Sequence, residues 1–245
     1  MGVILVHLKG SDRHVHINKL FTRISEHYDL LNNVMSAGRH HAWRKTAAKL
    51  VTEELIGPAL DIATGTGDFA IELARQSTVT ESVGVDSTEA MISQAKRKIT
   101  TLSTGTNIAL LIGDGHKLPF CDNYFTAVTI GFGIRNFVNL KEAMIETVRV
   151  LRPGGRVAIL EIVRIENRNF INGFFSSGFR KITPLLGAFL AQDRAAYTYL
   201  PESVDQFLTA GEVGTIMRDA GLRIIARKKR ALGSVAILVG EKISN

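Results

Sequence analysis

The stretch Leu60-Asp61-Ile62-Ala63-Thr64-Gly65-Thr66-Gly67-Asp68 decides how this chain folds. It follows an apolar run and precedes a helical pattern over residues 69–75, which predicts a strand, a sharp glycine turn and a helix start. Gly65 and Gly67 permit positive φ and have no Cβ to keep a ligand away. The helix beyond them offers free N–H groups and a positive dipole end. With Asp86 about 20 residues further on, the pattern predicts a nucleotide-like cofactor on an α/β sheet.

Strands and helices alternate around this turn. Short apolar runs predict strands near 58–63, 81–86, 107–112, 125–130 and 155–163, and helical patterns near 68–76, 88–103 and 139–151 lie between them. A helix over 203–220 and an antiparallel pair of strands near 222–229 and 235–240 are expected to follow. This alternation indicates one doubly wound α/β domain over 1–245, with a mostly parallel, seven-stranded, Rossmann-like sheet.

Two segments fall outside the alternation. Residues 11–51 are basic and histidine-rich and are expected to form a helical cap, with one helix around 21–31 and a second over 36–51 that Ser36 caps. No cysteine accompanies the histidines, so solvated helix faces are favoured over a zinc cluster, and no metal is expected. Residues 164–203 mix phenylalanines and leucines with basic residues, which predicts a helical insertion placed as a substrate lid.

Composition limits the classes of protein. The chain has 245 residues and one cysteine, Cys121, so an intrachain disulfide is excluded and a reducing cytoplasm is the simplest compartment. No apolar run approaches the roughly 20 residues that a membrane span needs. The formal charge of +7 is compatible with nucleic acid, an anionic membrane surface or an acidic ligand, and does not choose between them.

Acidic residues at the predicted strand ends narrow the cofactor. Asp86 ends the second strand and could accept both ribose hydroxyls of either NAD or S-adenosylmethionine, and Asp114 ends the third and could accept from the adenine amino group. Asp61 and Asp68 place negative charge beside the glycine turn, where it would repel a pyrophosphate and attract a sulfonium and an α-amino group. The acids therefore favour S-adenosylmethionine.

The chain then resembles a known family. Asp61–Asp68, Val83–Asp86, Asp114 and Leu151–Gly155 are similar to the motifs of class I S-adenosylmethionine-dependent methyltransferases. The closer resemblance is to the quinone C-methyltransferases of menaquinone and ubiquinone biosynthesis, and it covers about residues 20–240. It rests on Tyr28–Asn32, Ser36–Trp43, Phe132–Asn136, Arg149–Arg156, Ala191–Asp193 and Tyr197–Ser203. Departures occur at Ala63–Gly67, at Gly115-His116 and at Gln192-Asp193, where this family more often has other residues.

The resemblance implies methylation of a ring carbon of a polyprenylated hydroquinone. The acceptor hydroxyl must ionise at least partly, and a phenol has a reference pKa of about 10. Arg135 could hold the phenolate or orient a water or carboxylate, Asn136 could fix the ring oxygen, and the base could be His40, Asp193 or a water. The implied cofactor residues are Asp61, Thr64, Gly65, Gly67, Asp86, Asp114 and Gly115. The implied substrate residues are Tyr28, Asn32, Trp43, Phe132, Asp193 and Tyr197.

Partners and rival functions follow from the same residues. Demethylmenaquinol is the expected acceptor, because no mitochondrial-type presequence is evident, and 2-polyprenyl-6-methoxy-1,4-benzoquinol is the alternative. The enzyme is expected in the cytoplasm, visiting the inner face of the cell membrane through basic residues in 9–49 and the segment 168–194, without nucleic acid; a homodimer is a candidate assembly. The rivals are an RNA or protein methyltransferase, an NAD-dependent dehydrogenase and a non-catalytic interaction protein.

Overall fold

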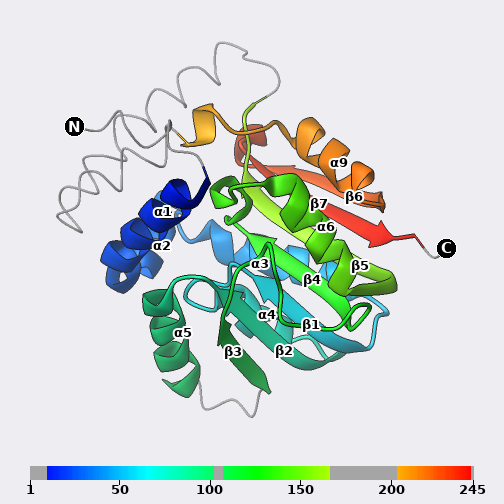
Figure 1. Cartoon of the computed structure of the whole chain (residues 1–245), viewed down its shortest axis with the longest axis horizontal. Helices are drawn as coiled ribbons and strands as arrows, with labels where there is room; N and C mark the ends of the chain where they lie inside the picture. Colours follow the sequence, from blue (N-terminus) through cyan, green and yellow to red (C-terminus); the bar gives the residue numbers. More distant parts are fainter. Residues whose placement is uncertain (1–9, 102–106, 166–202, 244–245) are drawn as a thin grey trace.

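The computed structural model describes residues 10–101, 107–165 and 203–243, and these form a seven-stranded sheet with helices on both faces (Figure 1). The sheet order is β3-β2-β1-β4-β5-β7-β6. All neighbouring strands are parallel except for β7, which runs antiparallel to both β5 and β6. The strands are β1 (Gly57–Ile62), β2 (Val79–Asp86), β3 (Ile108–Ile112), β4 (Phe125–Gly131), β5 (Leu151–Ile162), β6 (Leu222–Arg230) and β7 (Val235–Lys242).

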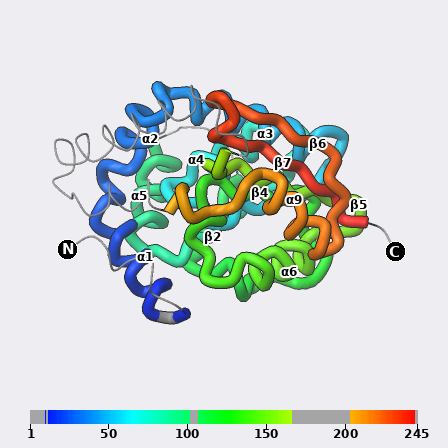
Figure 2. Tube along the Cα trace, turned by 90° about the horizontal axis from the view of Figure 1, so that it is seen from above, coloured from blue at the N-terminus to red at the C-terminus, as the bar shows by residue number. Residues whose placement is uncertain are grey.

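The helices divide between the two faces and one edge of the sheet. The helices are α1 (Gly10–Ile24), α2 (Tyr28–Ser36), α3 (Arg39–Thr52), α4 (Asp68–Ala74), α5 (Glu89–Thr101), α6 (Leu140–Val150) and α9 (Ala210–Asp219), and the short 3-10 turns are η2 (Ser25–His27), η3 (Ile134–Asn136) and η4 (Ala231–Gly233). Helices α3 and α4 share an apolar cluster with one face of the sheet, and α6 and α9 share a second cluster with the other face. Figure 2 shows α1 and α2 at one end of the molecule and α9 and β6 at the other.

The strand sequences explain their places in the sheet. Strand β4 is central and reads Phe-Thr-Ala-Val-Thr-Ile-Gly, a nearly continuous buried run, as expected for a parallel strand covered on both faces. Strand β6 lies at the edge and alternates between more exposed and less exposed residues. The order places the glycine turn after β1, next to β4, where the order of the strands reverses. Ligands of such sheets bind at this switch point.

The predicted strands and the final hairpin are confirmed, with boundaries that differ by at most four residues. Two helices begin later than expected. The helix expected from Ser36 begins at Arg39, because Ala37 and Gly38 both take left-handed φ and end α2 first. The helix expected over 203–220 becomes α9 from Ala210, where Thr209 and Glu212 form a capping box. The predicted insertion, 164–203, lies almost wholly outside the described residues.

Candidate active site

The glycine turn between β1 and α4 forms the floor of the site. Gly65 and Gly67 take φ of +56° and +83°, and Ala63 takes +54°, which is unfavourable for a residue with a Cβ. The amide of Gly67 donates to the carbonyl of Thr64 at 2.9 Å and closes the turn. A Cβ on Gly67 would lie 3.1 Å from the Cβ of Ala95 on α5, so the turn packs closely against this helix.

Asp86, at the end of β2, supports this turn and faces the pocket. Its two carboxylate oxygens accept from the backbone amides of Gly65 and Thr88, each at 2.8 Å. Burial raises its pKa, and these hydrogen bonds oppose that rise. Since each oxygen can accept a second hydrogen bond, Asp86 could still bind the hydroxyls of a ligand.

Asp114, after β3, forms a second polar position with His116. The backbone amide and Nδ1 of His116 lie 2.9 and 2.7 Å from the same Asp114 oxygen, and Nε2 accepts from the amide of Asn139 at 3.2 Å. Burial acts to raise the pKa of Asp114, but the hydrogen bonds from His116 outweigh it and leave the pKa low. Both ring nitrogens of His116 are therefore engaged, and the ring orients Asp114. The sequence marked Gly115-His116 only as a departure from the family pattern and did not predict this role.

A pocket opens between these strand ends, and helix α1 and the loop after β4 form its other walls. It encloses about 680 Å³ of empty space, a volume that includes its open mouth. Arg13 of α1 donates to the carbonyls of Arg135 and Phe137 at 2.9 and 3.3 Å, and the Asn18 side chain accepts from the Ser87 hydroxyl at 3.0 Å. The residues that face the ligand space from these walls include His14, Ile17, Phe21, Tyr28, Phe132 and Asn136.

The structure pairs Arg135 with Glu161 of β5. The guanidinium contacts a carboxylate oxygen of Glu161, and both side chains are buried. Glu161 also accepts from the amide of Ile162 at 2.7 Å. Burial raises the pKa of Glu161, and the charge of Arg135 counteracts this. Arg135 does not line the pocket, whereas its neighbour Asn136 does. The pair therefore holds the loop that presents Asn136.

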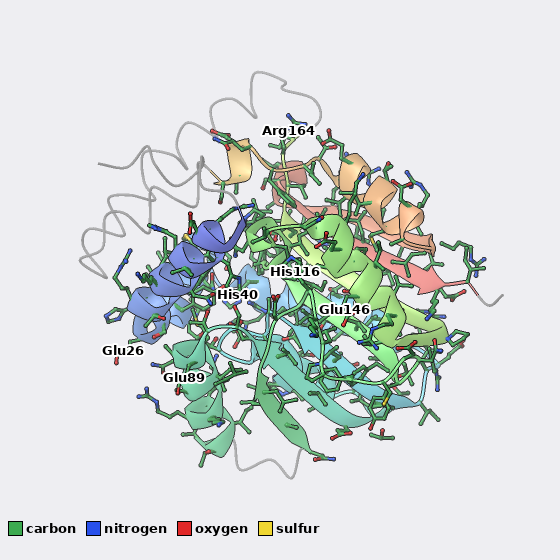
Figure 3. The ribbon with its side chains drawn as sticks, viewed as in Figure 1. Glu26, His40, Glu89, His116, Glu146 and Arg164 are labelled. Atoms are coloured by element: carbon green, nitrogen blue, oxygen red, sulfur yellow. The ribbon has the colours of Figure 1, made fainter. Side chains whose placement is uncertain are left out.

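His40, on α3, lies outside the pocket, and both of its ring nitrogens make contacts. Nε2 lies 2.9 Å from Oδ1 of Asn33, and Nδ1 contacts the guanidinium of Arg44. Because guanidinium only donates, Nδ1 accepts and Nε2–H donates. Burial and the charge of Arg44 lower the pKa of His40 to about 4, so the ring is neutral near pH 7. Figure 3 shows His40 and His116 near the middle of the molecule, whereas Glu26 and Glu89 lie at its outer edge.

Asp61 and Asp68 do not present their charges to a ligand in the pocket, in contrast to the expectation from the sequence. Asp68 points away from the pocket, toward Lys98 at 2.7 Å and Arg44 at 3.5 Å, which neutralise its charge. Asp61 is buried behind the turn and accepts from the Thr129 hydroxyl at 2.7 Å, and burial raises its pKa to about 7. The acids that line the pocket are Asp86 and Asp114.

The same lysine ties the cap to the turn. Lys98 of α5 lies 2.5 Å from the carboxylate of Asp29 on α2, and it donates to the Thr66 hydroxyl at 3.0 Å. Thr66 in turn donates to Asp29 at 2.5 Å. Together with Asp68, this network joins α2, α4 and α5 around the glycine turn. Asp68 also lies near His40 and His41, and the three offer ligand atoms within 4.8 Å of one another.

Several predicted site residues lie elsewhere. Trp43 packs against the apolar cluster under α3 and does not line the pocket. Asn32 lies beside Tyr28, behind the pocket wall, and Thr64 is buried in the turn. Asp193 and Tyr197 lie outside the described residues. Pocket residues that the sequence did not single out include His14, Asn18 and Met91. Only the helical spacing that includes Phe21 indicated an apolar helix here.

Comparison with known proteins gives a consistent match along the chain. A family model described as the ubiE/COQ5 methyltransferase family matches residues 8–242. A ubiquinone/menaquinone biosynthesis C-methyltransferase UbiE from Geobacter sulfurreducens is 37% identical over 227 residues, 92% of this chain and 88% of the relative. Demethylmenaquinone methyltransferases from Roseiflexus castenholzii and Thermotoga maritima are 38% and 36% identical, over 93% and 88% of this chain and 93% and 91% of the relatives.

Solved structures agree on the fold. A chain from the complex of the Haloferax volcanii Trm112 methyltransferase activator with a methyltransferase has a TM-score of 0.66 at 16% identity, covering 91% of this chain and 98% of that one. An S-adenosylmethionine-dependent methyltransferase from Thermotoga maritima has a TM-score of 0.60 at 18% identity, covering 91% of this chain and 99% of that one. At these identities the likeness establishes the class I methyltransferase fold alone, as predicted.

Proposed function

Since this chain belongs to the ubiE/COQ5 methyltransferase family, we propose that it transfers a methyl group from S-adenosylmethionine to a ring carbon of demethylmenaquinol. The observation that carries the proposal is the family match over residues 8–242, which includes every element that forms the pocket. The relatives are named for menaquinone synthesis alone or for both quinones. A second candidate acceptor is therefore the polyprenylated methoxybenzoquinol of ubiquinone synthesis.

The residues present fit this cofactor. Gly115 forms a wall that has no room for a side chain, because a Cβ there would lie 3.0 Å from Ile62 and 3.2 Å from Phe137. Asp86 would accept from the ribose hydroxyls and Asp114 from the adenine amino group, with Gly65 and Gly67 around the amino-acid end. When bound, the cofactor supplies an electrophilic methyl group. Asp61 and Thr64 would not contact the cofactor directly. From behind the turn they would maintain its conformation, and Asp61 would add negative charge near it.

Asn136 and Tyr28 are the polar side chains placed to meet the acceptor ring. Asn136 can donate a hydrogen bond to the ring oxygen from the loop that Arg135 and Glu161 hold. Burial raises the pKa of Tyr28, so its hydroxyl stays protonated and can also donate. Phe132 supplies an apolar wall. These donors would stabilise charge on the ring oxygen as it ionises.

The hydrogen bonds of His40 and Arg135 reduce the number of candidates for the group that accepts the substrate proton. In its observed hydrogen bonds, His40 has no lone pair left for a substrate proton. Arg135 is a permanent cation paired with Glu161, and it acts here as a positioning residue. Asp193 and a water molecule are the candidates that this arrangement leaves. Tyr197 and Asp193 would contribute from the segment that precedes α9.

The acceptor's apolar tail places it in a bilayer, so the enzyme must reach a membrane surface. Within the described ranges no helix combines the length and the apolar character of a membrane span. We propose that the enzyme works in the cytoplasm and contacts the inner face of the cell membrane transiently, because the acceptor's tail is held there. A homodimer is a candidate assembly for this enzyme.

One assay tests the proposal: transfer of labelled methyl groups from S-adenosylmethionine to each reduced quinol, dispersed in detergent. Methylation of demethylmenaquinol is the expected result, and methylation of the benzoquinol alone would replace it with the second candidate. Transfer to neither quinol, with S-adenosylmethionine bound, would overturn the function. Asn136→Ala should lower kcat about a hundredfold, as for loss of one donor to a developing oxyanion, with KM for S-adenosylmethionine little changed.

A further inference from the structure

The turn that joins β6 to β7 combines four consecutive basic residues with an exposed leucine. Strand β6 ends in Arg227-Lys228-Lys229-Arg230, and η4 follows with Ala231-Leu232-Gly233. Leu232 is 63% exposed, one of the largest exposures of an apolar side chain in the described part of the chain. Its neighbours Arg227, Lys229 and Ala231 are also exposed. We name residues 227–233 the basic turn.

The basic turn lies at the same edge of the sheet as the pocket. Strand β6 is parallel to β5, since both are antiparallel to β7. Arg230 therefore pairs with Val235, which pairs with Ile162 at the carboxyl end of β5. Lys229 pairs with Ala236, which pairs on its other side with Glu161, the partner of Arg135. Strand β6 is three strand spacings from β4, roughly 15 Å. Figure 1 shows the turn at the end of β7 opposite the C-terminus, and Arg164, labelled in Figure 3, leaves β5 at this edge.

Two residues of the basic turn have an unfavourable backbone conformation. Ala231 and Leu232 take φ of +47° and +55°, a left-handed conformation that residues with a Cβ rarely adopt. Ser234 fixes the turn, since its amide and hydroxyl donate to the carbonyl of Ala231 at 3.1 and 2.8 Å. Its own carbonyl accepts from the amide of Val163 at 2.9 Å. A strained backbone persists only where the surrounding contacts hold it in place, as the hydrogen bonds of Ser234 do here. In this conformation the Leu232 side chain projects into solvent.

Charge and shape together select one partner. Lysines on an edge strand also prevent pairing with another chain, but that role needs no exposed leucine held on a strained turn. Basic side chains around an apolar tip match an anionic bilayer, where the cations meet headgroups and the leucine enters the interface. We propose that the basic turn docks this enzyme on anionic phospholipid headgroups, with the pocket edge toward the bilayer. The proposal rests on the proposed function, which requires an acceptor held in a membrane.

Sedimentation with vesicles tests the docking. The wild-type chain should bind phosphatidylcholine vesicles that contain phosphatidylglycerol, and not phosphatidylcholine alone, in about 0.1 M salt; about 1 M salt should release it. Lys228→Gln with Arg230→Gln should weaken binding about 25-fold, at about fivefold per basic residue. The matched control, Arg218→Gln with Arg223→Gln, removes the same charge at the opposite edge and should change binding less than about threefold.

Leu232→Ser should weaken binding by about fivefold or more without loss of charge. Equal losses in the basic-turn pair and the control pair would overturn the proposal, as would full binding by Leu232→Ser. Retention of the wild-type chain on an RNA oligonucleotide, with no vesicle binding, would replace the lipid partner with nucleic acid.

Methyl transfer keeps the two proposals distinguishable. The basic-turn variants should retain wild-type transfer to a short-tailed, dispersed quinol and lose it for a long-tailed quinol in vesicles. If the wild-type chain methylates neither quinol but binds vesicles through residues 228, 230 and 232, the proposed function fails and the docking surface stands.

Discussion

Removal of the guanidinium of Arg135 gives the sharpest test of how the site is supported. Arg135→Met keeps similar volume but leaves the Glu161 carboxylate, which is fully buried, without its cationic partner. Breaking a buried pair from one side costs about 3–5 kcal/mol, because the remaining charge is uncompensated. For a chain of this size that corresponds to a fall in Tm of about 6–20 °C.

The loss should depend on pH, with a sign that the structure decides. Without Arg135, burial raises the pKa of Glu161 still further above its unfolded value. A carboxyl with a raised folded pKa contributes stability below its unfolded pKa and loses it as pH rises through the folded pKa. Urea unfolding should therefore show a larger deficit for Arg135→Met near pH 8 than near pH 5.

Two further variants decide whether the pair is the cause. Arg135→Met with Glu161→Leu should recover most of the stability, since neither charge is then left buried. Arg75→Met, which breaks the exposed pair with Glu72, should cost less than about 1 kcal/mol. A deficit below about 1 kcal/mol for Arg135→Met, or additive losses in the double variant, would refute the pairing. Full methyl transfer by the stable double variant would remove Arg135 from the reaction.

Three other perturbations follow from the network around the turn. Because the pKa of His40 is lowered to about 4, the neutral ring contributes its full share to the free energy of unfolding above about pH 6.5, and about 3 kcal/mol is lost as pH falls through about 4. In urea unfolding, His40→Gln should flatten this pH dependence and His41→Gln should not. Because Asp61 is charged only above about pH 7, affinity for S-adenosylmethionine should fall up to tenfold from about pH 8 to about pH 6 by calorimetry, and a slope that survives in Asp61→Asn would contradict its role. Lys98→Met should destabilise the chain by about 1–3 kcal/mol and raise KM for S-adenosylmethionine, whereas Lys96→Met on the outer face of α5 should do neither; equal effects would exclude the network.

The fold was predictable because its signals are local. Each strand is a short buried run bounded by turn residues, and each crossover carries a helical period, so alternation alone predicted the sheet. The ends of helices were less predictable. Left-handed φ at Ala37, a residue that seldom adopts it, ended α2 and shifted the start of α3. No sequence rule marks an alanine for that conformation.

The candidate site was predictable where strand ends define it. Asp86 and Asp114 follow two neighbouring strands, and the topology alone brings both to one pocket. The direction of a side chain was not predictable. Asp68 was expected to face a cationic ligand, but it turns toward Lys98 and Arg44, which are 30 and 24 residues away in the chain.

The sequence by itself therefore determined the sheet, the glycine turn, the acids that end two strands and the resemblance that names the chemistry. Only the tertiary structure decided which charges are available to a ligand, because that depends on partners from distant elements. It buried Arg135 against Glu161, engaged both nitrogens of His40 and set a basic turn beside the pocket edge. Local periodicity fixes which elements form, whereas pairing of charges in a low-dielectric interior fixes what each side chain can do.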